Sequence, residues 1–333
     1  MDQDNRLMDL PIDIQVEIFN RIEVTDLMGL RSVSRDFHDI LKKTSVLSIN
    51  DEKFLRRMLI IRRSKSPYSS NPIEPLTEIK IRVPVSSETI NKLLRTNNNT
   101  LKNLSLSLGP LGGQILSPLR FNALTILNLE ETRRIALQTL LSGTPVLKSL
   151  TLKNCAFTSE TKTLLLNSQT LKTINLLRCD LTPFATILIQ ITHVHGLTWD
   201  DNNIISNFRL MIEAEEIKTL VFLGTLVETS FHVSTIGESF IAVPDLSPLG
   251  PTKFENDFYK MMNGVSGSMI MGMDATTAQI LYLALLDGKK PITFRRLRRI
   301  NLRGSGTHRN RNRGLIMDSL RSLTIPGGGV YEI

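Results

Sequence analysis

Three apolar residues spaced Leu-x-x-Leu-x-Leu return along the chain at nearly constant intervals. Successive copies begin at Leu101, Leu124, Leu147, Leu171, Val194 and Ile217, so the steps are 23, 23, 24, 23 and 23 residues. A looser copy begins at Leu76, and two later copies begin at Leu297 and Leu320. A repeat of this length exposes an apolar side that only its neighbours can cover. The spacing therefore predicts strands that stack side by side in a solenoid.

This pattern resembles the leucine-rich repeat, which typically has a period of about 20–29 residues. Cys155, Cys179 and Asn202 follow the third apolar residue of their repeats by three positions. In the family this residue points inward and hydrogen-bonds the turn backbone. The resemblance implies that both cysteines are buried, reduced thiols, and the alternative is a disulfide or a metal pair.

The segments between the strands are expected to be helical. Ile135, Leu137, Leu140 and Leu141 form one such apolar group, and Ser159 can begin another that leads to Leu164–Leu166. The expected fold class is α/β, a curved parallel sheet with helices outside. Residues 228–290 are less regular: Phe240–Val243 and Val265–Ile270 could be degenerate repeats, with a Pro- and Gly-rich loop between them.

The N-terminal segment has a second pattern, which runs from Leu10 to Phe37. Leu10-Pro11, Asp13, Ile18-Phe19, Asp26-Leu27 and Val33-Ser34-Arg35 occupy its key places. It resembles the F-box, the three-helix module that docks substrate receptors onto SCF-type (Skp–cullin–F-box) ubiquitin ligases. Three helices of about 10 residues cannot bury this much apolar surface among themselves, so a partner is expected. The alternative is a helical cap on the repeats.

The resemblance implies that the F-box binds a Skp-family adaptor, and through it a cullin–RING complex. The apolar positions expected to make this contact are Leu10, Pro11, Ile14, Ile18, Ile22, Leu27, Leu30 and Val33. The expected domains are the F-box at 1–48, a basic linker at 49–70 and repeats at 71–333.

Two phrases resemble plant proteins that join an F-box to leucine-rich repeats. One is Leu140-Leu-Ser-Gly-Thr-Pro-Val-Leu147, and the other is Phe258–Ser266. Such proteins often carry a further C-terminal domain, and this chain is expected to end before it.

Composition narrows the function classes. The hydrophobic fraction of 41% is typical of a folded protein, and no apolar run reaches the roughly 18–20 residues that span a bilayer. With two cysteines and no secretory signal, the chain is expected in the cytoplasm, the nucleus or both. Its net charge of +8 is concentrated near the C-terminus, where residues 289–333 hold 11 basic and 2 acidic side chains.

No residue group makes a case for catalysis. His193 and His195 could share one side of a strand, but zinc needs further ligands. The glycines at 109–113 lack the Lys-Ser/Thr of a phosphate-binding loop, and 264–267 lack the spacing of a nucleophile elbow. We therefore expect no enzyme activity, cofactor or metal, although a hydrolase within 228–290 is a rival hypothesis.

The residues between the repeat leucines are expected to line the concave face and to contact a protein target. Those singled out are Glu130, Lys153, Asn175, Asp200, Arg299 and Arg303. The basic groups at 56–65 and 295–313 are read as a solvated surface, as a site for an acidic or phosphorylated target, or as a nucleic-acid site. The sequence predicts the substrate-recognition subunit of an SCF ubiquitin ligase. A repeat scaffold that binds nucleic acid is the alternative.

Overall fold

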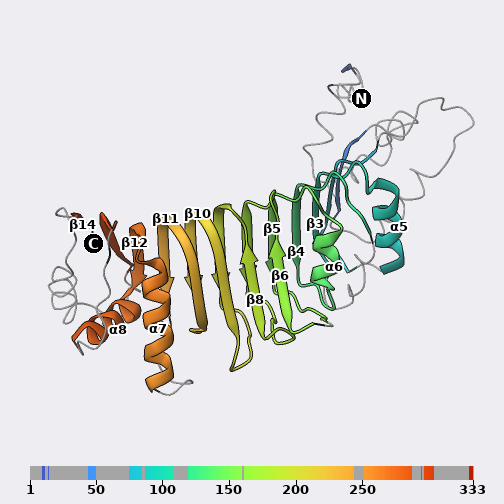
Figure 1. The fold of residues 1–333 in the computed structure, drawn as a ribbon. Helices are drawn as coiled ribbons and strands as arrows, with labels where there is room; N and C mark the ends of the chain where they lie inside the picture. The colour runs from blue at the N-terminus through green and yellow to red at the C-terminus, as the bar shows by residue number, and fades with distance from the viewer. Residues whose placement is uncertain are drawn as a thin grey trace, which may run out of the picture. The chain divides into compact units, whose positions relative to one another are not determined.

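The computed structural model describes residues 10–11, 14, 44–49, 75–84, 87–108, 119–159, 161–243, 251–286, 294, 296–303 and 330–332. They divide into two compact units, residues 1–147 and residues 148–333. Each unit contains parallel strands that pair side by side in the order of a solenoid (Figure 1).

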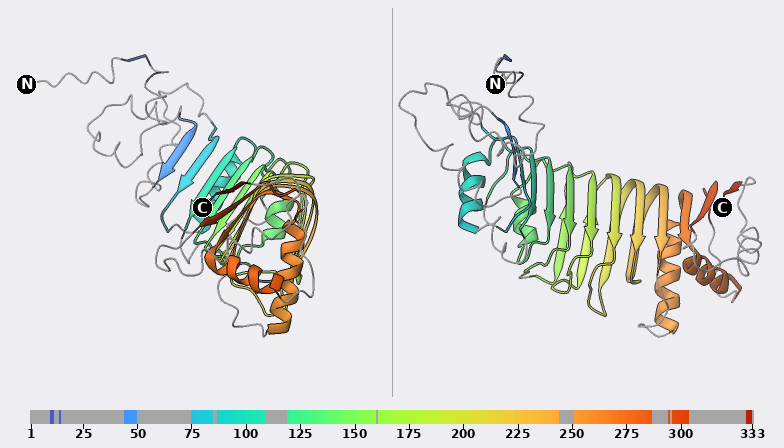
Figure 2. Two further views of the ribbon diagram at one scale, coloured as in Figure 1. Left: turned by 90° about the vertical axis from the view of Figure 1, so that its left-hand side faces the viewer. Right: turned by 180° about the vertical axis from the view of Figure 1, so that it is seen from behind.

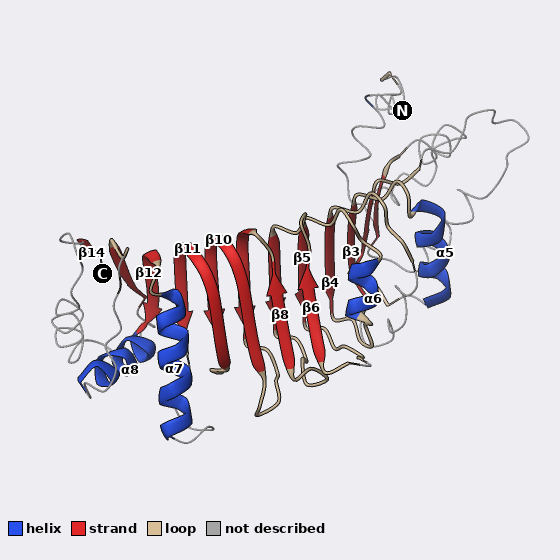
Figure 3. Ribbon diagram, in the orientation of Figure 1, coloured by secondary structure: helices blue, strands red, loops and turns tan. Residues whose placement is uncertain are grey.

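The described residues of unit 1 form parallel strands in chain order: β1 (Val46–Ile49), β2 (Glu78–Ile81), β3 (Asn103–Ser107) and β4 (Ile126–Glu130). Helix α5 (Ser87–Asn97) lies between β2 and β3 in the chain, and α6 (Leu137–Ser142) follows β4 (Figure 3). The Asn97 side chain links the end of α5 to the segment just before β2, because its Oδ1 accepts from the Leu76 backbone N–H at 2.9 Å. The helix predicted from Ile135 to Leu141 is confirmed by α6.

Strand β1 covers residues 46–49, where the expected F-box ends and the expected linker begins, and it pairs with β2. The first strand of the sheet therefore precedes the segment expected to be a basic linker. Most of that segment lies outside the described residues.

Unit 2 contains a long parallel sheet, here called the principal sheet. Its order is β5 (Ser149–Lys153), β7 (Thr173–Leu177), β9 (His193–Asp200), β10 (Arg209–Leu223), β11 (Glu228–Ala242), β12 (Ser268–Asp274), β13 (Arg299–Arg303) and β14 (Val330–Glu332). The predicted strands at Leu150, Ile174, Leu197, Leu220 and Ile300 are confirmed.

A second sheet accompanies the first. Strand β6 (Thr163–Asn167) pairs with β8 (Thr186–Gln190), and β8 pairs with the first half of β10. The 15-residue strands β10 and β11 pair along nearly their whole length, and their second halves belong to the principal sheet. Two views from other sides show these strands running the full height of the unit (Figure 2).

The helix expected from Ser159 toward Leu166 is wrong, because residues 163–167 form β6. Leu164 and Leu166 are buried while Leu165 between them is half-buried, and this alternation is the two-residue period of a strand. Three consecutive leucines carry no period of their own, and the pairing with β8 decides the conformation.

The irregular region 228–290 contains β11, helix α7 (Pro251–Val265), β12 and helix α8 (Ala275–Leu286). Its two degenerate repeats are real, since β11 and β12 continue the parallel pairing. Helix α7 lies alongside β11 (Figure 1), and Gly264 allows this approach: a Cβ there would come within 2.3 Å of the Phe231 ring. Strand β13 pairs with β12 on one side and with β14 on the other, and the repeat predicted at Leu320 lies outside the described residues.

The turns after the strands share one conformation. Glu131, Asn154, Arg178, Asp201 and Gly224 all have positive φ angles, from 44° to 106°, and they recur at the repeat spacing. In unit 2 each of the last four donates its backbone N–H to the carbonyl at the end of the next strand, at 2.6–3.0 Å. These turns stack in the same way as the strands.

Inside the turns, the Asn/Cys position behaves as the resemblance implied. Asn202 is buried, accepts from the Cys179 N–H at 2.8 Å and donates to the Leu176 carbonyl at 3.0 Å. The Cys179 thiol donates to the Leu152 carbonyl at 3.3 Å, and the Cys155 thiol to the Lys153 carbonyl at 3.4 Å.

Candidate functional site

The described part of the expected adaptor surface is short. Leu10, Pro11 and Ile14 are described, and the Ile14 N–H donates to the Pro11 carbonyl at 3.0 Å, as in a first helical turn. Leu10 is 37% exposed and Ile14 48%, so both aliphatic side chains are open to solvent and available to a partner. The other five adaptor residues, Ile18, Ile22, Leu27, Leu30 and Val33, lie outside the described residues.

The second candidate surface is the solvent-facing side of the principal sheet in unit 2, here called the open face. Along each strand the core residues point to one side, and the residues between them are half-buried on the other. The register aligns these outward residues in rows. One row joins Thr151, Asn175 and Thr198, and the next joins Lys153, Leu177 and Asp200.

The open face brings together three of the residues expected to contact a target. Lys153 and Asp200 share one row, and Asn175 lies in the adjacent row, where its amide donates to the Thr151 hydroxyl at 3.1 Å. Glu130 ends β4 and belongs to unit 1. Arg299 and Arg303 lie on β13, in register with Ile270 and Asp274 of β12.

The open face differs from the expected one on β10 and β11, where it is apolar. Val221 is in register with Phe240, and Leu223 with Ala242, so four half-buried apolar residues form a block two strands wide. Phe240 also covers Gly272 of β12, where an added Cβ would come within 2.5 Å of its ring. We call Val221, Leu223, Phe240 and Ala242 the apolar block. The sequence signal for this block is the alternation of Val221 with Leu223 and of Phe240 with Ala242 along their repeats.

Neither cysteine offers a reactive site. Both are buried free thiols, as predicted, at equivalent positions of adjacent repeats. A hydrogen bond with the Cys155 side chain lowers the pKa of Cys179, and burial opposes this shift.

His193 and His195 are exposed on β9, as expected from their spacing. The His193 ring lies 3.8 Å from the Glu215 carboxylate and 3.6 Å from the Glu216 carboxylate.

Among the described residues, no group of three or more His, Cys, Asp or Glu side chains is placed to hold a metal ion. No helix within the same residues is long and apolar enough to cross a membrane.

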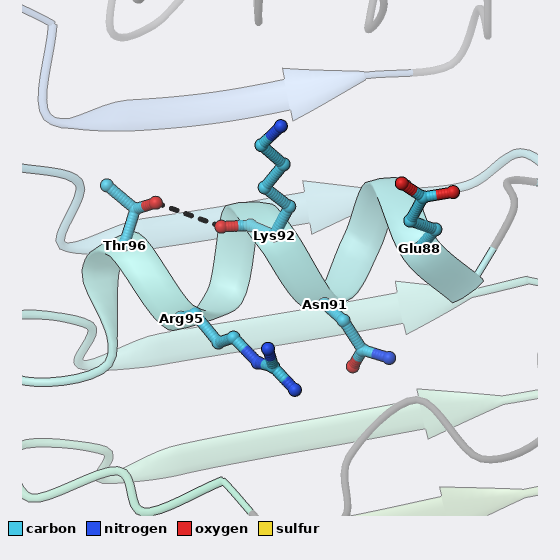
Figure 4. Close-up of a pocket in the computed structure, with 5 residues that line it drawn as sticks. All are labelled: Glu88, Asn91, Lys92, Arg95 and Thr96. Carbon is cyan, nitrogen blue, oxygen red and sulfur yellow. Dashed lines mark hydrogen bonds between the residues drawn. The ribbon is translucent and has the colours of Figure 1, made fainter.

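A surface hollow in unit 1 is lined by Glu88, Asn91, Lys92, Arg95 and Thr96, all from α5 (Figure 4). Thr96 is occupied with its own helix, since its hydroxyl donates to the Lys92 carbonyl at 2.9 Å. The remaining side chains fan outward along one helical face, and their arrangement suggests no reaction.

Comparison with family models gives two matches. Residues 7–48 match the F-box domain, and residues 69–248, more than half of the chain, match the family described as "FBD-associated F-box protein At5g56370, LRR repeats". No curated protein and no solved structure matches the chain. An F-box joined to leucine-rich repeats is typical of substrate-recognition proteins of SCF-type ligases, which are generally not catalytic themselves. The chain belongs to the F-box proteins with FBD-associated leucine-rich repeats.

Proposed function

We propose that this chain is the substrate-recognition subunit of an SCF ubiquitin ligase. Its F-box docks to a Skp-family adaptor, and the open face of its repeats holds a protein target. The observation that carries the proposal is the order of the two family matches, an F-box at 7–48 followed by repeats at 69–248. The exposed Leu10 and Ile14 support it, because a partner that covers them removes apolar surface from water.

Such a subunit acts without forming or breaking a covalent bond. It holds a lysine of the target close to the ubiquitin-charged enzyme, and proximity and orientation supply the rate gain. This role requires no cofactor and no catalytic side chain of the chain itself. A subunit with this role works in the cytoplasm or the nucleus. The location of a fluorescent fusion in cells would test this part of the proposal.

The open face suits target binding because the backbone beneath its side chains is ordered. Its side chains stand on strands whose backbones are fixed by pairing on both sides, so little conformational entropy remains to be lost on binding. Lys153, Asn175 and Asp200 offer a cation, an amide and a carboxylate within two adjacent rows.

Adaptor binding is the direct test. We expect the full chain to co-purify a Skp-family adaptor, and the double substitution Leu10→Ala with Pro11→Ala to lower recovery at least tenfold. Leu283→Ala is the matched control, because it removes an equally exposed aliphatic side chain from α8. Undiminished recovery by the double variant would remove the basis for the docking assignment.

The alternative function, nucleic-acid binding through the basic C-terminal end, has a weaker basis. Arg296 and Arg298 are exposed and Arg299 is half-buried, while the remaining arginines of 295–313 have side chains outside the described residues. If the chain binds nucleic acid, the affinity of the complex should fall steeply as the salt concentration rises. Substitutions in the F-box should not change that affinity.

A further inference from the structure

A row of basic residues runs along the leading edge of the open face. Each member follows the first apolar residue of its repeat: Lys148 and Lys172 immediately precede β5 and β7, and His195 and Lys218 lie at the same repeat position within β9 and β10. Backbone hydrogen bonds link neighbours directly: Lys172 N–H donates to the Lys148 carbonyl and His195 N–H to the Lys172 carbonyl, both at 2.7 Å. We call these four residues the basic ladder.

The ladder is not neutralised by the acids of the sheet. Lys148, His195 and Lys218 are exposed and Lys172 is half-buried, and no ion pair involves any of them among the described residues. The closest contact of the Lys172 ammonium is with the His193 carbonyl, at 3.4 Å. Glu215 and Glu216 face the His193 ring instead. Like charges on neighbouring strands oppose folding, so the free protein gains nothing from this arrangement.

The row of the open face beside the ladder consists of small residues, three of which carry a hydroxyl group. The next residues along the strands are Ser149, Thr173, Gly196 and Thr219, aligned by the register of β5, β7, β9 and β10. Hydroxyls next to ammonium groups are the donors that carboxylates and phosphates use. The short side chains leave the ladder accessible from the open face.

The dimensions of the ladder fit an extended polypeptide. Neighbouring strands are about 4.8 Å apart, so the three steps from Lys148 to Lys218 span about 14 Å, the length of about four extended residues. The apolar block begins at Val221, three residues and about 10 Å beyond Lys218 on the same strand.

We propose that the open face binds an extended target segment that combines about four residues rich in carboxylates or phosphates with one large apolar side chain. The anionic residues lie on the basic ladder, and the apolar side chain lies on the apolar block. This inference rests on the proposed function and narrows it to a class of target. Nucleic acid fits less well, because a polynucleotide has a phosphate at every nucleotide, whereas the basic ladder ends at Lys218 and the apolar block lies beyond it on the same strand.

Full-length protein purified with its adaptor would be tested against two libraries of eight-residue peptides, one with Asp and Glu and one with phosphoserine as the only anion. We expect selected peptides to contain an anionic run followed or preceded by Leu, Ile, Val or Phe. The library that gives the tighter binders identifies carboxylate or phosphate as the anion.

Three variants separate the two halves of the site. Lys148→Glu, Lys172→Glu and Lys218→Glu together should weaken selected peptides at least tenfold, and Val221→Ser with Leu223→Ser should abolish the apolar preference. Lys162→Glu is the control, because Lys162 is an exposed lysine that immediately precedes the second sheet. Thermal melting shows that each variant is folded.

Peptides without an anionic run, full binding by the triple variant, or tighter salt-sensitive binding of a 20-nucleotide RNA that displaces the peptides would each overturn the inference. Adaptor binding is measured on the same samples. Loss of peptide selection with intact adaptor binding would therefore refute the target class alone, and absence of adaptor binding would refute the proposed function.

Discussion

Single residues determine whether the turns between repeats can stack. Asn202 satisfies two backbone groups at once, the N–H of Cys179 and the carbonyl of Leu176. Both groups belong to the preceding repeat, so one side chain holds two repeats together. At the same position of the adjacent repeats, the Cys155 and Cys179 thiols donate to backbone carbonyls.

We predict that Asn202→Ala lowers the free energy of unfolding by about 1–3 kcal/mol, because a buried N–H and a buried carbonyl lose their partner. Asn203→Ala is the matched control: its amide bonds to the Asp180 carboxylate in an exposed position, and its loss should change stability by no more than about 0.5 kcal/mol. Urea unfolding measures both. Equal effects of the two substitutions would contradict the role assigned to Asn202.

The turn glycine gives a second prediction. Gly224 has a φ of +106°, and a Cβ there would come within 2.9 Å of the Asp201 Cα. Gly224→Ala should therefore destabilise the protein by about 1–3 kcal/mol. Gly267→Ala, where a Cβ meets nothing within 4 Å, should have little effect in the same thermal melts. A harmless Gly224→Ala would show that the turn rearranges without cost.

Much of this residue-level structure was readable from the sequence. The resemblance to leucine-rich repeats implied the inward role of Cys155, Cys179 and Asn202, and it is confirmed. The positive φ angles were not readable, because Glu131, Asn154, Arg178 and Asp201 are different residue types and only position 224 is a glycine. Stacking of neighbouring turns sets this conformation.

At the scale of elements, charged side chains join β10, β11 and α7. The Glu228 carboxylate lies 3.1 Å from the Lys260 ammonium and 3.0 Å from the Arg209 guanidinium. The pKa of Glu228 is lowered, first by the hydrogen bond from Lys260, and also by Arg209. A carboxylate with a depressed pKa stabilises the folded state above its ordinary pKa, and this contribution disappears as the pH falls through the folded value.

We predict that Glu228→Gln lowers the melting temperature at pH 7, and that the difference from the unsubstituted protein vanishes below about pH 4. The effect should be small and should decrease with salt, since the carboxylate is 36% exposed. Glu238→Gln serves as the control on the same strand, because Glu238 is exposed and in no ion pair among the described residues. A pH-independent difference would mean that Glu228 acts through packing.

Element types were predicted well where a period was visible and poorly where it was not. The strands with the Leu-x-x-Leu-x-Leu spacing form wherever the structure describes them, whereas the contiguous Leu164–Leu166 predicted a helix and form β6. The second sheet has no motif of its own. Its strands are defined by pairing between segments 19–23 residues apart, which the sequence pattern does not display.

At the scale of the whole molecule, the stacked repeats create surfaces that no single repeat contains. The basic ladder and the apolar block each depend on register between strands, so their residues are distant in sequence and adjacent in space. The repeat spacing predicts which single residues face outward, such as Lys153 and Asp200, but the apolar block depends on the register between β10 and β11, which a repeat pattern does not display.

The central claim is that an F-box and a target-binding face work in one chain. Affinity purification of the full chain from cells with the proteasome blocked, analysed by mass spectrometry, tests it most directly. We predict that the unsubstituted chain recovers a Skp-family adaptor, a cullin and ubiquitinated partners that accumulate under the block. The Leu10→Ala, Pro11→Ala variant should lose the adaptor and the cullin but keep the partners without ubiquitin, while the triple ladder variant should keep the adaptor and lose the partners. Recovery of neither adaptor nor cullin by the unsubstituted chain would contradict the claim.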